Sequence, residues 1–169
     1  MKAKLIIDGK EFPIEIQDPE LQKLLTPQKK TGYERVGAEQ MYWMQDMNDS
    51  ACWTTEPICY DENNKDYNCA NYYSDESVAK NNARADALTR KLRRFAVEHR
   101  NKKMNWANEG MRKYYICTIC GTDELTCDFT YTVRGFGTIY FDTEEVAELA
   151  IKTFHDELVW YFTEYKDSL

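Results

Sequence analysis

The sequence predicts an α+β fold in which an N-terminal β-hairpin and a short helix precede two β-β-β-α units, each with a small antiparallel sheet packed against one helix. The first observation behind this prediction is a pair of apolar runs around Asp8-Gly9, a dipeptide that favours a tight type I′ turn. The second is an internal repeat, in which residues 71–79 align with residues 139–147. In both copies a strand pattern changes directly into a helix pattern.

The first 37 residues predict the hairpin, the short helix and a linker. Pro13 indicates that the second strand of the hairpin lies at a sheet edge, because proline cannot donate to a strand ladder. Asp18-Pro19 has the form of a helix N-cap followed by the first helical residue, before a segment that contains Leu21, Leu24 and Leu25. Residues 26–38 are polar and contain proline and glycine, so we expect a connection there.

The two repeated units are expected over residues 38–103 and 104–169. Aromatic strands precede each copy, at residues 41–44 and 114–117. A first helix over about residues 75–100 would be capped by Ser74 or Asp75. A second helix over about residues 143–165 would be capped by Asp142 or Thr143. Glu145 follows Asp142 by three positions, as in the acidic half of a capping box.

Each predicted helix carries one apolar stripe at helical spacing, which we expect to face a sheet. The stripe of the first helix contains Val78, Ala85, Leu88, Leu92, Phe95 and Ala96, and that of the second contains Ala147, Ile151, Phe154, Leu158, Tyr161, Phe162 and Tyr165. Val146, Leu149 and Trp160 fall off the second stripe. They either form an exposed apolar patch or pack beneath the N-terminal hairpin.

Composition excludes several classes of protein. The chain has 22 Lys and Arg against 29 Asp and Glu, a formal charge of −7, which argues against general affinity for nucleic-acid phosphates. No apolar run approaches the roughly 18 residues of a membrane span, so no membrane association is expected. Residues 1–20 contain no apolar signal core, so we expect a reducing compartment in which the six cysteines are not paired in disulfides.

The cysteines near residue 120 allow two interpretations. Cys117, Cys120 and the following Gly121 have the form of a zinc knuckle, and Cys127 could supply a third thiolate, which makes zinc the one cofactor predicted. Alternatively, Cys117 and Cys127 are cross-strand neighbours of a hairpin that turns near Thr122. In that case they face the core, where a free cysteine behaves as a small hydrophobic residue.

No catalytic arrangement is apparent, and we predict that the protein is not an enzyme. The two histidines, His99 and His155, lack a partner at the spacing that a nucleophile and base would require. His99 is expected to complement a helix C-terminus. A basic cluster along the first helix and beyond is read as a solvated face in preference to a phosphate-binding one; it comprises Arg90, Lys91, Arg93, Arg94, Arg100, Lys102 and Lys103.

Acidic residues are in excess over positions 101–169, where 12 Asp and Glu face 7 Lys and Arg. Some of them start the second helix, where carboxylates stabilise the helix dipole. The same carboxylates could instead form a surface that competes for a basic, nucleic-acid-binding groove. Both interpretations stay open for the acidic residues in turns, on strands and at the helix start, namely Asp123, Glu124, Asp128, Asp142, Glu144, Glu145 and Glu148.

Four stretches together carry a family resemblance: residues 70–75, 93–100, 137–142 and 154–169. Over most of its length the chain resembles small accessory proteins encoded in phages and prophages of Gram-positive bacteria. Some proteins of this kind are anti-CRISPR inhibitors, which bind a type II RNA-guided nuclease and block the loading of target DNA. The resemblance implies a protein of the host cytoplasm that inhibits a host defence nuclease by contact.

The functional prediction is therefore a partner-binding surface without catalysis and without direct nucleic-acid binding. Its predicted contact residues are Asp123, Glu124, Asp142, Glu144, Glu145, Glu148 and Trp160. One alternative is a phage structural or assembly protein that forms a homodimer or higher oligomer through Trp160 and Leu149. Another is a nucleic-acid-binding accessory protein that uses the basic cluster with exposed tyrosines.

Overall fold

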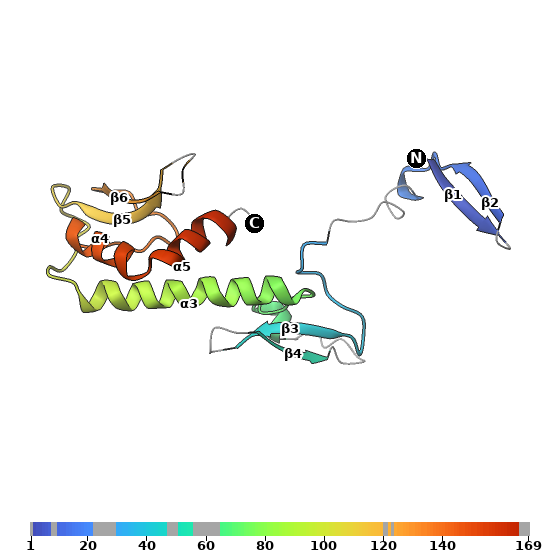
Figure 1. Cartoon of the computed structure of the whole chain (residues 1–169), viewed down its shortest axis with the longest axis horizontal. Helices are drawn as coiled ribbons and strands as arrows, with labels where there is room; N and C mark the ends of the chain where they lie inside the picture. Colours follow the sequence, from blue (N-terminus) through green and yellow to red (C-terminus); the bar gives the residue numbers. More distant parts are fainter. Residues whose placement is uncertain are drawn as a thin grey trace.

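The computed structural model describes residues 2–7, 10–21, 30–46, 51–55, 65–119, 122 and 124–165. Within these ranges the strands form three two-stranded antiparallel sheets, and helices make up most of the remaining regular structure (Figure 1). The predicted α+β class is therefore confirmed. None of the helices in these ranges combines the length and apolarity needed to cross a membrane.

The N-terminal hairpin forms as predicted. Strands β1 (Lys2–Ile7) and β2 (Lys10–Glu15) pair so that Ile7 lies opposite Lys10, which leaves a two-residue connection; the connecting Asp8-Gly9 lies outside the described residues. Asp18 caps the helical turn that follows, because its Oδ1 accepts the backbone N–H groups of Glu20 and Leu21 at 2.8 and 3.3 Å. The hairpin stands apart from the other elements (Figure 1).

The repeat predicted from the sequence appears as two similar sheets, each followed by a helix. The first sheet pairs β3 (Met41–Gln45) with β4 (Ala51–Thr55), and a short helix, α2 (Lys65–Asn68), comes before the joint to the long helix. The second sheet pairs β5 (Lys113–Thr118) with β6 (Leu125–Thr130).

The predicted third strand of each unit is reduced to a single bridge. Tyr73 exchanges two backbone hydrogen bonds with Trp43 at 2.8 and 2.9 Å, and Phe141 does the same with Tyr114 at 2.9 and 2.8 Å. Tyr73 and Phe141 are equivalent positions of the repeat, which agrees with the alignment. No full strand forms because each bridging residue is followed within two residues by a helix cap, and the chain leaves the sheet.

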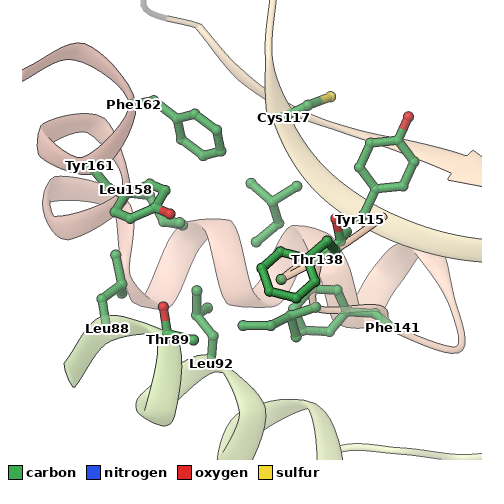
Figure 2. A pocket seen from close by; sticks show the side chains of 14 residues that line it. Leu88, Thr89, Leu92, Tyr115, Cys117, Thr138, Phe141, Leu158, Tyr161 and Phe162 are labelled. Carbon is green, nitrogen blue, oxygen red and sulfur yellow. The ribbon is translucent and has the colours of Figure 1, made fainter. Parts of the chain in front are cut away.

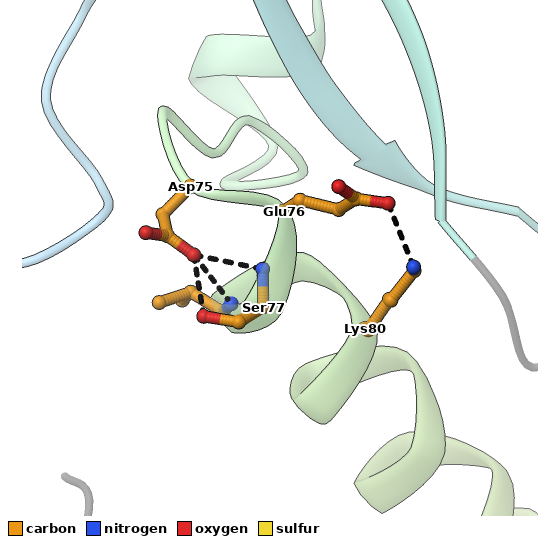
Figure 3. Close-up of polar contacts among 5 residues, drawn as sticks. Asp75, Glu76, Ser77 and Lys80 are labelled. Atoms are coloured by element: carbon orange, nitrogen blue, oxygen red, sulfur yellow. Dashed lines mark hydrogen bonds and ion pairs between the residues drawn. The ribbon is translucent and has the colours of Figure 1, made fainter.

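The first long helix, α3 (Glu76–Glu98), begins and ends with side-chain caps. Asp75 Oδ1 accepts the backbone N–H groups of Ser77 and Val78 at 2.7 and 3.3 Å, and Glu76 pairs with Lys80 one turn on at 2.7 Å (Figure 3). At the other end the His99 ring stacks on Phe95 with its Nδ1 3.0 Å from the Phe95 carbonyl oxygen. The same carbonyl oxygen accepts the His99 backbone N–H at 3.0 Å, so the last turn of the helix is closed at His99.

The second helix is not continuous, contrary to the prediction. It divides into α4 (Glu144–Thr153), α5 (His155–Trp160) and a π-helical turn, η1 (Tyr161–Tyr165), with Phe154 at the break. Thr143, not Asp142, is the N-cap, since its Oγ1 accepts the Val146 N–H. Glu145 consequently does not occupy the capping-box position, which is the third residue after the cap.

Helix α3 is shared between the two units. Its first half lies against β3 and β4, and the helices of the second unit lie along it from Asn82 and Arg84, which contact Tyr165 and Trp160, to Phe95 (Figure 1). The main core cluster joins three residues of α3 to five of the second unit: Leu88, Leu92, Phe95, Phe141, Val146, Ala147, Ala150 and Leu158. Because this core takes residues from both units, the second unit depends on α3 for burial of its apolar face.

A polar network connects the C-terminal turn, α3, the linker and the first sheet. The Tyr165 hydroxyl donates to Asn82 Oδ1 at 2.7 Å, and Asn82 Nδ2 donates to the Tyr33 hydroxyl at 2.9 Å. The Tyr33 ring lies 5.4 Å from that of Tyr73, whose hydroxyl accepts from Gln45 Nε2. Burial raises the pKa of both Tyr73 and Tyr165 to about 12.

These raised pKa values predict alkaline destabilisation. The neutral Tyr73 and Tyr165 hydroxyls contribute to the free energy of unfolding. This contribution is complete below the unfolded-state pKa of about 10 and is lost as the pH rises through about 12. The free energy of unfolding should show this fall when it is measured by urea titration at about every half pH unit from about pH 9 to about pH 12. The double variant Tyr73→Phe, Tyr165→Phe should show a shallower slope, and an equal slope would contradict the assignment.

Gly32 predicts a second measurable effect on stability. Its φ is +87°, and an added Cβ would lie 2.6 Å from Val78 Cγ2 on α3. Gly137 is the matched control, because its φ is +75° but nothing lies within 4 Å of an added Cβ. We expect Gly32→Ala to cost about 2–4 kcal/mol in free energy of unfolding and Gly137→Ala about 1 kcal/mol. Equal losses in urea titrations would show that Val78 relaxes freely.

Candidate functional site

The acidic candidate surface is centred on α4. Glu144, Glu145 and Glu148 are all exposed, and helical spacing places Glu148 next to both others on the outward face. Leu149, 44% exposed, lies beside Glu145 on the same face. Within the described part of the chain, no ion pair neutralises the three glutamates. We call Glu144, Glu145, Glu148 and Leu149 the α4 face.

Packing beneath α4 holds this face in place. Val146, Ala147 and Ala150 are buried on the opposite side of the helix, which lies against β5 and β6. The pKa of Glu145 is lowered by a hydrogen bond from its own backbone N–H and by another from the Thr143 side chain. Glu145 is therefore ionised at neutral pH and is partly held in position by the N-terminus of the helix.

The other predicted acidic contacts have different surroundings. Glu124 is exposed just before β6, and Asp123 lies outside the described residues. Asp128 faces away from α4, since it lies opposite Tyr115 and accepts the Tyr115 hydroxyl at 3.2 Å. Of the predicted acidic residues, the described part of the chain therefore brings together only those of α4.

Asp142 is not available to a partner, contrary to the prediction. It is 6% exposed, and its Oδ2 accepts the backbone N–H groups of Asn101 and Lys102 at 2.7 and 2.6 Å. Its Oδ1 is buried without a hydrogen-bond partner. The reason is its place at the joint between the Phe141 bridge and α4, where the carboxylate fixes the chain that leaves α3.

Trp160 is likewise buried, which corrects its assignment as a contact residue. It is 7% exposed, with the Arg84 guanidinium of α3 3.7 Å from its ring centroid and the Tyr165 ring 5.6 Å away. Val146 is also buried, so of the three residues in the expected apolar patch only Leu149 is exposed. The break at Phe154 changes which residues face α3, and Trp160 packs there instead of beneath the N-terminal hairpin.

The second hairpin differs from the predicted pairing by one residue. Cys127 lies opposite Ile116, and Cys117 lies opposite Thr126, so the two cysteines are on opposite faces and are not cross-strand neighbours. Cys127 packs against the core cluster. Burial raises the pKa of both thiols.

This register bears on the zinc hypothesis. A single ion cannot be held by Cys117 and Cys127 together, and the described residues contain no group of three His, Cys, Asp or Glu side chains able to hold a metal. Cys120 lies outside the described residues. Zinc at Cys117 and Cys120 stays a prediction, without Cys127 as the third thiolate.

The basic cluster and the histidines are used within the fold where their contacts are described. Lys91 pairs with Glu157 of α5 at 3.0 Å, and Arg94 lies 3.8 Å from Glu98 on its own helix. His155 is exposed and its Nδ1 lies 3.0 Å from Asp156 Oδ1.

Sequence patterns did not identify Lys113 as buried. It is 0% exposed, and its Nζ donates to the carbonyl oxygens of Asn108 and Tyr131 and lies 5.2 Å from the centroid of the Trp106 ring. These acceptors come from loops on either side of the second hairpin, so no local sequence pattern could predict that Lys113 binds them. Its role is structural, because it joins those loops.

Comparison with protein-family models, with curated proteins and with solved structures found no match for this chain.

The different roles of Asp142 and Glu148 predict different losses of stability. Asp142→Ala would leave the backbone N–H groups of Asn101 and Lys102 without their charged acceptor, at an expected cost of about 2–3 kcal/mol. Glu148→Ala changes an exposed residue and should stay within about 0.5 kcal/mol of the wild type. Urea unfolding measures both; similar losses would contradict a structural role for Asp142.

Proposed function

We propose that the protein is a non-enzymatic, phage-encoded inhibitor that binds a host defence nuclease in the host cytoplasm, of the anti-CRISPR type that blocks target-DNA binding by a type II RNA-guided effector. The observation that carries this proposal is the α4 face, three exposed carboxylates around Leu149 on a helix whose other side is buried. The resemblance to phage accessory proteins supplies the biological setting.

The α4 face suits a basic groove for physical reasons. A groove that binds nucleic acid attracts carboxylates by the same Coulombic force that attracts phosphates. Because the backing of α4 is packed, Glu144, Glu145 and Glu148 are presented without reordering of the backbone, which lowers the entropic cost of association. Leu149 adds an apolar group that can be desolvated near the centre of the contact.

The alternatives receive less support. Self-association was expected to use Trp160 and Leu149; Trp160 is packed under Arg84, and of the two only Leu149 is exposed. Nucleic-acid binding was expected to use the basic cluster, in which Lys91 is paired with Glu157 and Arg94 lies beside Glu98. The acidic excess of the second unit also opposes binding to phosphates.

The decisive variant is Glu144→Gln, Glu145→Gln, Glu148→Gln. It keeps side-chain size while it removes three negative charges from the α4 face. We expect it to lose at least tenfold in inhibition of labelled target-DNA binding by guide-loaded type II effectors of Gram-positive bacteria. The matched control removes the same charge from exposed sites elsewhere: Glu15→Gln, Glu20→Gln, Glu109→Gln. It should inhibit like the wild type.

Salt and order of addition complete this test. Inhibition should weaken as the salt concentration rises, because the Debye length falls to about 10 Å at 0.1 M ionic strength and the attraction between the carboxylates and a basic groove is screened. It should be strong when the protein precedes the DNA and weak when it follows. Absence of inhibition across a panel of effectors, or equal loss in the control variant, would overturn the proposal.

A further inference from the structure

A pocket of about 350 Å³ opens between the two units at the shared helix. Its floor is formed by α3, with Leu88 and Leu92, and one wall by α5 and η1, with Leu158 and Phe162 (Figure 2). The opposite wall comes from β5 and from the segment that leads to the Phe141 bridge. The pocket uses none of the carboxylates of the α4 face, so it is a separate feature of the fold.

The lining is uncharged throughout the part of the chain that the structure describes. Its polar groups are hydroxyls and one thiol, and two of the hydroxyls already have acceptors: Thr89 donates to the Ala85 carbonyl oxygen at 3.0 Å, and Tyr115 donates to Asp128 at 3.2 Å. A charged ligand would be desolvated here without a counter-charge, so the pocket selects neutral molecules.

Aromatic rings surround the space. Phe141 and Phe162 line its inner part, and Phe136 lies at the rim with a relative exposure of 108%, which means that its ring has essentially no packing partner in the folded chain. Phe136 stands between Gly135 and Gly137, the latter with φ +75°. A flat apolar molecule in the pocket would cover this ring and remove it from water.

We propose that this pocket is a binding site for an uncharged aromatic small molecule of two or three rings. The size follows from the volume, since an apolar cavity of about 150 Å³ holds one benzene ring and this pocket is about twice as large. Thr89 Oγ1 keeps its acceptor capacity after donating to Ala85, so a ligand N–H or O–H can be received on the floor.

The test uses two fluorescent probes that share a ring system but differ in charge. N-phenylnaphthylamine is neutral and carries one N–H, whereas anilinonaphthalene sulfonate has the same rings with a negative charge. Titrated into the full chain, the neutral probe should bind once per chain with a dissociation constant on the order of 10–100 μM. The sulfonate should bind at least tenfold more weakly.

Two exposed residues provide a variant and its control. Phe136→Ala should weaken binding of the neutral probe three- to tenfold, and because Phe136 is fully exposed the change should leave the fold intact. Val133→Ala removes another exposed apolar side chain that does not line the pocket and should have no effect. The variant Glu144→Gln, Glu145→Gln, Glu148→Gln should bind the probe normally, which separates this site from the proposed function.

Several outcomes would overturn the proposal. They are the absence of saturable binding, equal affinity for the two probes, and Phe136→Ala binding as tightly as the wild type. Loss of probe binding as the protein concentration rises, with dimers seen by sedimentation, would instead assign the pocket to a second copy of the chain.

Discussion

Two backbone hydrogen bonds in each unit set the geometry on which the other elements depend. Tyr73 with Trp43, and Phe141 with Tyr114, tie the chain to the free edge of a strand immediately before a helix starts. Two residues after each bridge a capped helix has begun, at Asp75 for α3 and at Thr143 for α4. The bridge therefore fixes where each helix leaves its sheet, and the core forms where the two helices meet.

In each unit, a carboxylate links the segment between the bridge and the helix to the stretch of chain that precedes the unit. In the first unit Glu34 lies on the preceding segment and accepts the Ser74 hydroxyl and the Gly32 N–H. Hydrogen bonds from the Thr31 backbone N–H, from its own backbone N–H and from the Thr31 and Ser74 hydroxyls lower the pKa of Glu34 to about 2. In the second unit the carboxylate belongs to the joint itself, at Asp142. Ser74 and Asp142 are equivalent positions of the repeat. Both link the segment before the helix to the preceding chain, but the carboxylate lies on the preceding chain in the first unit and at the repeat position itself in the second.

The sequence predicted the secondary structure correctly where a residue type favours one particular local conformation. The N-terminal hairpin, a helix cap at one of the two residues Ser74 and Asp75, and the equivalence of Tyr73 and Phe141 all followed from such rules. The hairpin register did not, because a shift of one residue in the turn moves Cys117 to the other face of the sheet and leaves Cys127 on the core face, with apolar Ile116 opposite it. The helix break at Phe154 was not predicted because no glycine or proline lies there. Trp160 is buried as a result of this break.

The shared helix also explains why the α4 face lies on the second unit and why the pocket lies where α3 meets that unit. The α4 face is rigid because the helix packs into a core whose other half is Leu88, Leu92 and Phe95 of α3. The pocket is bounded by the same Leu88 and Leu92 of α3 and by Leu158 of α5. The first unit positions α3 and thereby supports a contact surface that it does not itself carry. Binding at either surface then needs little ordering of the chain, which leaves more of the contact energy for affinity.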